Sequence, residues 1–257
     1  PGNYTYTISC TGAGGTSTPQ SAVVTVTAAA PPPNGALTNV ALINTANASQ
    51  ANAVTTFGHV FKRGDVPAGA TVVARDASDA PVVLQVDPKA THVDGSLRHA
   101  VLTARLPAIG AGAAQTVTLF ARPASGGTTP PVALADLLAT SFDARVSLNV
   151  AGTVYAASAR DLLQNTAARV WLSGPEVSEW IVGGPVRTAG GAAHPHLAAY
   201  FHVRAYAGSP IGRVRVDTVV ENGWTFVNGA MAFTYVPTVT VGAATIYDNG
   251  GASLTHH

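Results

Sequence analysis

The fold class of this chain is decided by residues 57–106, FGHVFKRGDVPAGATVVARDASDAPVVLQVDPKATHVDGSLRHAVLTARL. Short segments rich in valine, such as 70–74 and 82–86, alternate here with turns built on glycine and aspartate. β-Branched residues favour strands, whereas Gly and Asp favour the tight turns between strands. The stretch therefore predicts consecutive short strands, which is typical of a small barrel or a sandwich.

The same pattern extends outward and divides the chain into modules. Residues 1–29 hold two strand-like segments around a Gly-rich turn. The prolines at 31–33 lie in a spacer that we expect at 30–36, because a Pro-rich run favours an extended backbone. A small β-barrel domain is expected at 37–123 and an antiparallel β-sandwich at 132–257. The predicted protein is all-β, with helical turns expected only within 132–142 and from Asp161.

The first module resembles the last two strands of an immunoglobulin-like repeat. The resemblance rests on GNYTYTISCTG at 2–12 and AVVTVT at 22–27. Two strands cannot bury a core of their own, so we expect the earlier strands of such a domain to precede them. Cys10 is the single cysteine, which excludes an intrachain disulfide. We expect it to be a small buried residue, with an intermolecular pair or a reactive thiol as the alternative.

Composition excludes several classes of function. Charged residues make up 11% of the chain and the net charge is +1, with the basic residues scattered. Nucleic-acid binding needs clustered Lys or Arg, so no nucleic-acid partner is expected. No apolar run reaches the ~18 residues of a membrane span. The low charge and many small residues fit an extracellular protein or a virion component.

Residues 92–99, HVDGSLRH, gather the side chains that first suggest chemistry. One interpretation is a hairpin turn, because Asp-Gly is a strong turn dipeptide. The alternative is a ligand-binding rim formed by His92, Asp94, Arg98 and His99. A nucleophile elbow is excluded, because the Gly-x-Ser-x-Gly pattern is absent.

The same region resembles a known family. GHVFKRGDVPAG at 58–69, VVLQ at 82–85 and DGSLRHAVL at 94–102 are similar to the N-terminal barrel of exo-rhamnogalacturonan-lyase-like proteins. The resemblance covers about residues 40–122, with a weaker echo at 173–180 and 206–210. It implies a barrel followed by a sandwich, as in the family, and similar modules occur in bacteriophage virion proteins.

The sequence departs from the family pattern beside the Asp-Gly-Ser motif and in the region that follows the sandwich. His92 and Val93 stand where the family has an aromatic residue before Asp-Gly-Ser, and His99 replaces a common Trp. In the family a helical toroid follows the sandwich, and none is seen here. The resemblance therefore implies that lyase chemistry lies outside this chain, and no catalytic residue is assigned.

A second candidate site is Glu176, Glu179 and Trp180. Sugar-handling sites combine a carboxylate pair with an aromatic face. The alternative is surface charge beside a core Trp.

A weak metal-binding candidate is formed by His194 and His196, since alternate residues of an extended segment point to the same side. The alternative for these two residues is a solvated loop after Gly190 and Gly191. No metal site is assigned and no cofactor is expected.

These observations favour a structural or receptor-facing component of an extracellular assembly, and in the first place a bacteriophage tail or fibre protein with glycan contact. Its expected partners are other protein subunits, in a homo-oligomer, and a cell-surface polysaccharide. Two alternatives stay open: the non-catalytic N-terminal part of a polysaccharide lyase, and a carbohydrate-binding module. Whether the chain is an enzyme is left open, with a non-enzyme favoured.

Overall fold

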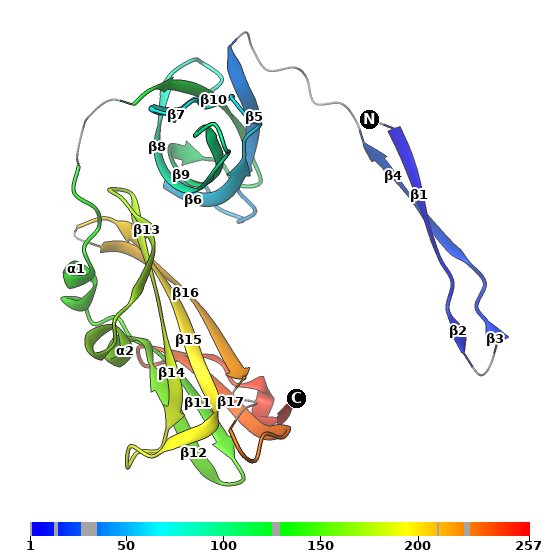
Figure 1. The fold of residues 1–257 in the computed structure, drawn as a ribbon, viewed down its shortest axis with the longest axis vertical. Coiled ribbons are helices and arrows are strands. Elements are labelled where there is room, and N and C mark those ends of the chain that lie inside the picture. Colours follow the sequence, from blue (N-terminus) through cyan, green and yellow to red (C-terminus); the bar gives the residue numbers. More distant parts are fainter. Residues whose placement is uncertain (1, 13–14, 27–34, 125–128, 210, 224–226) are drawn as a thin grey trace.

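The computed structural model describes residues 2–12, 15–26, 35–124, 129–209, 211–223 and 227–257. Strands dominate these residues, so the all-β prediction is confirmed (Figure 1). The helical turns expected within 132–142 and near Asp161 are confirmed as well. Most of the expected Pro-rich spacer at 30–36 lies outside the described residues. Among the described residues, no helix is long and apolar enough to cross a membrane.

The N-terminal hairpin pairs β1 (Gly2–Ile8) with β4 (Gln20–Val26), and its tip holds β2 (Thr11–Gly12) and β3 (Gly15–Thr16). Every residue of β1 is exposed. Alternation places Tyr4, Tyr6 and Ile8 on one face of the hairpin. The expectation that Cys10 is buried is wrong, because its thiol is exposed.

The barrel consists of six strands in the order β5-β10-β7-β8-β9-β6. They are β5 (Ala36–Ile43), β6 (Gln50–Val60), β7 (Ala70–Arg75), β8 (Pro81–Thr91), β9 (Leu97–Ile109) and β10 (Ala114–Pro123). The strands curl into a ring in Figure 1, and all neighbouring strands are antiparallel. Apolar side chains fill the interior, among them Val66, Leu102, Leu106, Val117 and Leu119.

The C-terminal half is a second antiparallel domain with two short helices. Its helices are α1 (Leu134–Leu138) and α2 (Ala159–Asn165), and η1 (Asn249–Gly251) is a short 3₁₀ turn. Its strands are β11 (Ala144–Val150), β12 (Thr153–Ser158), β13 (Arg169–Ser173), β14 (Val177–Arg187), β15 (Ala193–Ala207), β16 (Ile211–Asn222), β17 (Phe233–Val241), β18 (Ala244–Tyr247) and β19 (Leu254–His256).

These strands form two layers that are joined at one point. Strands β13 to β16 make one layer, and β12, β11, β17, β18 and β19 make the other. The only register pair between β12 and β14 is Ala156 with Arg187. Between the layers lies an apolar core to which Leu148, Trp180 and Phe201 contribute. The two layers therefore form a sandwich whose sheet opens at the join, and α2 packs there against β14.

The barrel and the sandwich meet through a buried polar junction centred on Gln85. The Gln85 Nε2 group donates to the Val177 carbonyl oxygen at 2.9 Å and to Asp87 Oδ2 at 2.7 Å. Its Oε1 atom accepts from the backbone N–H groups of Glu176 and Val177. Asp87 Oδ1 accepts from Ser173 N at 2.9 Å. Since buried polar groups are costly when they lack partners, this network fixes how the two domains meet.

Apolar contact and an ion pair surround this polar centre. Val101 of the barrel packs with Leu172, Val177 and Tyr206 of the sandwich. Arg105 Nε donates to Glu176 Oε2 at 2.5 Å at the edge of the junction.

Gly174 allows the two backbones to approach at the junction. A Cβ atom at this position would lie 2.3 Å from the Gln85 amide carbon, so any larger residue would collide with Gln85.

Candidate functional site

The Asp94-Gly95-Ser96 segment is the turn of a hairpin between β8 and β9, as one of the two interpretations predicted. Gly95 has φ +81°, which explains the glycine. Asp94 Oδ1 accepts from the Ser96 hydroxyl at 2.6 Å and from its N–H, and these bonds hold the pKa of Asp94 below its usual value. Ser96 Oγ in turn accepts from Gly64 N. The local bonds of Asp94 and Ser96 thus stabilise the turn itself.

The other residues of this predicted rim have separate surroundings. His92 Nε2 lies 3.0 Å from the Phe61 carbonyl oxygen, and the Arg98 side chain is exposed. His99 lies beside His59, whose pKa is lowered first by burial and then by the charge of His99. The structure therefore brings Asp94 and Ser96 together in the turn, while Arg98 is directed to solvent.

The predicted trio of Glu176, Glu179 and Trp180 is not assembled into one site. Glu176 belongs to the domain junction through Arg105. Glu179 lies on the outer face of β14, where its Oε2 accepts from Arg204 Nε at 2.5 Å. Trp180 points the other way, into the sandwich core, and is 5% exposed. The alternative interpretation, surface charge beside a core Trp, is therefore correct for Trp180 only. The two carboxylates lie in part-buried ion pairs rather than on the open surface.

The partner of Glu179 was missed in the sequence, because only the strand register reveals it. Arg204 stands opposite Glu179 on β15, and it stands opposite Arg215 on β16. Burial is the largest single influence on the pKa of Arg204 and lowers it, but the hydrogen bonds and charges of Glu179 and Tyr206 together raise this pKa overall. His202 Nδ1 lies 3.9 Å from the second Glu179 oxygen. The outer face of β14 to β16 is thus lined by paired charges.

His194 and His196 begin strand β15 and are buried, so the expectation of a solvated loop is wrong. The turn at 188–192 is short, and β15 already begins at Ala193. His194 Nδ1 accepts from the N–H groups of His196 and Leu197, and Phe233 lies against both rings. Among the described residues, no group of three or more His, Cys, Asp or Glu side chains could hold a metal ion.

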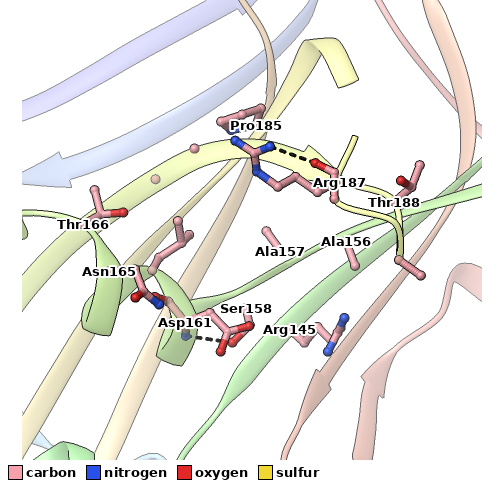
Figure 2. A pocket seen from close by; sticks show the side chains of 15 residues that line it. Arg145, Ala156, Ala157, Ser158, Asp161, Asn165, Thr166, Pro185, Arg187 and Thr188 are labelled. Carbon is pink, nitrogen blue, oxygen red and sulfur yellow. Dashed lines mark hydrogen bonds between the residues drawn. The ribbon is translucent and has the colours of Figure 1, made fainter. Parts of the chain in front are cut away.

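A groove at the join of the two sandwich layers was not foreseen in the sequence. It has a volume of about 530 Å³ and lies between β12, the open part of β14 and α2. Figure 2 shows Arg145 and Arg187 on opposite sides of Ala156 and Ala157, with Asp161 of α2 nearby. Gly183 and Gly184 belong to its lining and were the only hint in the sequence, because glycine inside a strand marks a close approach.

Helix α2 forms one wall of the groove because its first turn is fixed locally. The Ser158 hydroxyl accepts from Asp161 N at 3.0 Å, which caps the helix, and it donates to Asp143 Oδ1 at 2.8 Å. Gly184 faces the helix, and a Cβ atom there would lie 3.4 Å from Leu162 Cδ2, which is an ordinary van der Waals contact.

Comparison with known proteins bears on the barrel. Residues 37–119 match the family model of the PcRGLX-like N-terminal RIFT barrel domain. No curated protein matches the chain. The matched segment runs from β5 into β10 and contains the Asp94-Gly95-Ser96 turn. The resemblance to the exo-rhamnogalacturonan-lyase-like barrel is therefore confirmed for residues 37–119, which correspond to a RIFT barrel domain of a polysaccharide-lyase-like family.

Proposed function

We propose that this chain is a non-catalytic β-scaffold of an extracellular assembly that contacts polysaccharide. The observation that carries the proposal is the state of the two candidate acid–base residues. Glu176 and Glu179 each have a carboxylate oxygen 2.5 Å from an arginine Nε. General acid–base catalysis needs a carboxyl group within reach of the substrate proton. Here these oxygens serve the domain junction and the sheet instead.

The junction supports a scaffold in a second way. Gln85 and Asp87 are buried and bonded to three backbone N–H groups and one carbonyl of the sandwich. Relative domain motion is the ordinary expectation for domains joined through small interfaces. A buried and satisfied polar network opposes such motion, because every displacement would leave polar groups unpaired. The barrel and the sandwich would then carry a contact surface as one rigid body.

The family match favours a polysaccharide context for this scaffold. The matched barrel is that of a polysaccharide-lyase-like family, and the match offers no support for the bacteriophage tail that the sequence suggested. We therefore propose cell-surface polysaccharide as one partner and other subunits of an extracellular assembly as the second. Low charge and abundant small residues suit packing between such subunits.

The proposal is tested with the purified chain and two measurements. The first incubates it with pectic and capsular polysaccharides and follows the ultraviolet absorbance of newly formed unsaturated sugars, beside a working lyase as positive control. The second measures retardation in native gels that contain the same polysaccharides. We expect retardation without a rise in absorbance. A rise that scales with protein concentration and disappears in Glu179→Gln would refute the non-catalytic assignment, and free migration in every gel would refute glycan contact.

A second candidate is the non-catalytic N-terminal part of a polysaccharide lyase, which the RIFT barrel match favours. The reading frame downstream of His257 discriminates the two. Helical repeats rich in Trp, Tyr and His would favour the lyase, whereas further β-modules would favour the scaffold. Light scattering on the purified chain addresses the expected homo-oligomer directly.

A further inference from the structure

We propose that the groove between β12, β14 and α2 binds a sugar unit that carries one carboxylate, with Arg145 and Arg187 as its anion contacts. The inference rests on the glycan contact proposed above and narrows it to acidic saccharides.

Strand register places the two arginines on one face. Arg145 of β11 stands opposite Ser158 of β12, and Arg187 of β14 stands opposite Ala156 of the same strand. Directly opposed residues of antiparallel strands point to the same side of a sheet. Both arginines therefore lie on the outer face, on either side of β12. Ala156 between them is small, and this leaves the space seen in Figure 2.

The guanidinium groups have donors to spare. Arg187 Nη1 donates to the Gly191 carbonyl oxygen at 2.9 Å, which uses one of its five N–H groups and steadies the side chain. Among the residues that the structure describes, Arg145 has no ion-pair or hydrogen-bond partner. Guanidinium groups bind carboxylates through short charge-assisted hydrogen bonds. Both side chains thus offer N–H donors to a carboxylate bound in the groove.

The remaining lining selects a singly charged, hydroxyl-rich ligand. Asp161 lies in the same groove, so two arginines and one aspartate leave a net charge of one positive unit. One carboxylate matches this charge, whereas Asp161 repels the second charge of a phosphate group. Asp161 also offers acceptors for sugar hydroxyl groups, and Thr166 and Thr188 offer hydroxyl groups of their own. The volume of about 530 Å³ lies within the range of small-ligand sites.

The test is a titration followed by NMR on the full chain labelled with ¹⁵N. The probes are the methyl glycoside of glucuronic acid, its neutral counterpart methyl glucoside, and inorganic phosphate. We expect the glucuronoside to shift the Nε–H signals of Arg145 and Arg187. Its affinity should exceed that of methyl glucoside by about a hundredfold, which is the contribution of two charge-assisted hydrogen bonds of about tenfold each. Its affinity should exceed that of phosphate by about tenfold.

Three variants locate the binding. Arg145→Gln and Arg187→Gln should each weaken glucuronoside binding about tenfold. Ala156→Leu should abolish it by filling the groove while both arginines remain. Arg122→Gln is the matched control, because this exposed arginine lies on β10 of the barrel. Thermal melting confirms that each variant is folded.

The outcomes keep the two proposals apart. If the glucuronoside binds but the groove variants bind it like the wild type, the groove assignment is wrong and glycan contact stands. Equal binding of phosphate, or no shift at either arginine, also overturns the groove. Free migration of the wild-type chain in every polysaccharide gel is a separate result. It counts against the proposed function itself.

Discussion

The N-terminal hairpin and the Gln85 junction are built from the same kind of β-rich sequence, yet they are stabilised very differently. In the hairpin, Tyr6 and Ile8 stay 63% and 67% exposed. At the junction, Val177 is fully buried and Gln85 is 6% exposed. Strand pairing alone forms the first region, whereas side chains from two domains close the second. The difference teaches that a sequence with high strand propensity forms strands, whereas contacts between residues distant in sequence stabilise them.

The largest expected effect is at Gly174, where the junction has no spare room. Gly174→Ala would place its Cβ 2.3 Å from the Gln85 amide carbon, so Gln85 must move and lose its bonds. We expect a loss of about 3 kcal/mol in the free energy of unfolding, from overpacking and unpaired polar groups. Urea denaturation measures it. Ser173→Ala is the control and should be nearly neutral, because only its backbone N–H takes part.

Gln85→Leu tests the polar part of the junction. It leaves the N–H groups of Glu176 and Val177 without their acceptor, and Asp87 without its Gln85 donor. We expect a loss of about 2 kcal/mol in the free energy of unfolding. The neighbouring Val83→Ala is the control, since Val83 is 52% exposed. Equal denaturation midpoints for the two variants would show that the network contributes nothing net.

The free energy of unfolding should depend on pH through the buried His194, which has no counterpart in the exposed hairpin strand β1. His194 is packed against Tyr155, Phe233 and His196, and burial, with the charge of His196, lowers its pKa from the usual 6.5. The unfolded chain takes up this proton at a higher pH than the folded chain. Stability is therefore complete above pH 6.5 and falls as the pH drops below it.

His194→Asn isolates this contribution from that of His59. The Asn side-chain oxygen can replace Nδ1 as acceptor for the N–H groups of residues 196 and 197, but it does not titrate. The variant should lose part of the decrease in the free energy of unfolding that the wild type shows as the pH falls below 6.5, as measured by denaturation at several pH values. An unchanged pH dependence would assign the effect to His59 alone.

The smallest effect is expected in the hairpin. Tyr6→Ser removes an exposed ring that faces solvent, so the free energy of unfolding of the barrel and sandwich should change by less than about 0.5 kcal/mol. Differential scanning calorimetry checks this. A clear fall in the melting temperature would mean that the hairpin is covered in solution, and the contrast with the junction would then disappear.

The local structure was readable from the sequence wherever neighbouring residues decide it. The Asp94-Gly95-Ser96 turn follows from residues that bond to one another within two positions. Helix α2 begins where Ser158 caps it, close to the expected start at Asp161. The barrel was readable from its alternating strands and its family motif.

The domain junction, the ion pairs and the groove could not be predicted from the sequence, because they depend on strand register. Gln85 bonds to Val177, 92 positions away, and Arg105 pairs with Glu176, 71 positions away. A pattern of neighbouring residues holds no information on such pairs. The groove likewise exists only because β12 and β14 share a single register pair. Glu176 and Glu179 looked like an acid–base pair because their arginine partners could not be located.

The Gln85 junction also changes what separating the two domains would mean. A protease cut between Pro123 and Val132 would sever the covalent link but leave Gln85 bonded to the backbone at 176 and 177. The two fragments would then behave as subunits of a heterodimer rather than as independent domains. For gene fusion or domain shuffling, the pair is accordingly the smallest transplantable unit, since either half alone would carry an unfinished polar surface.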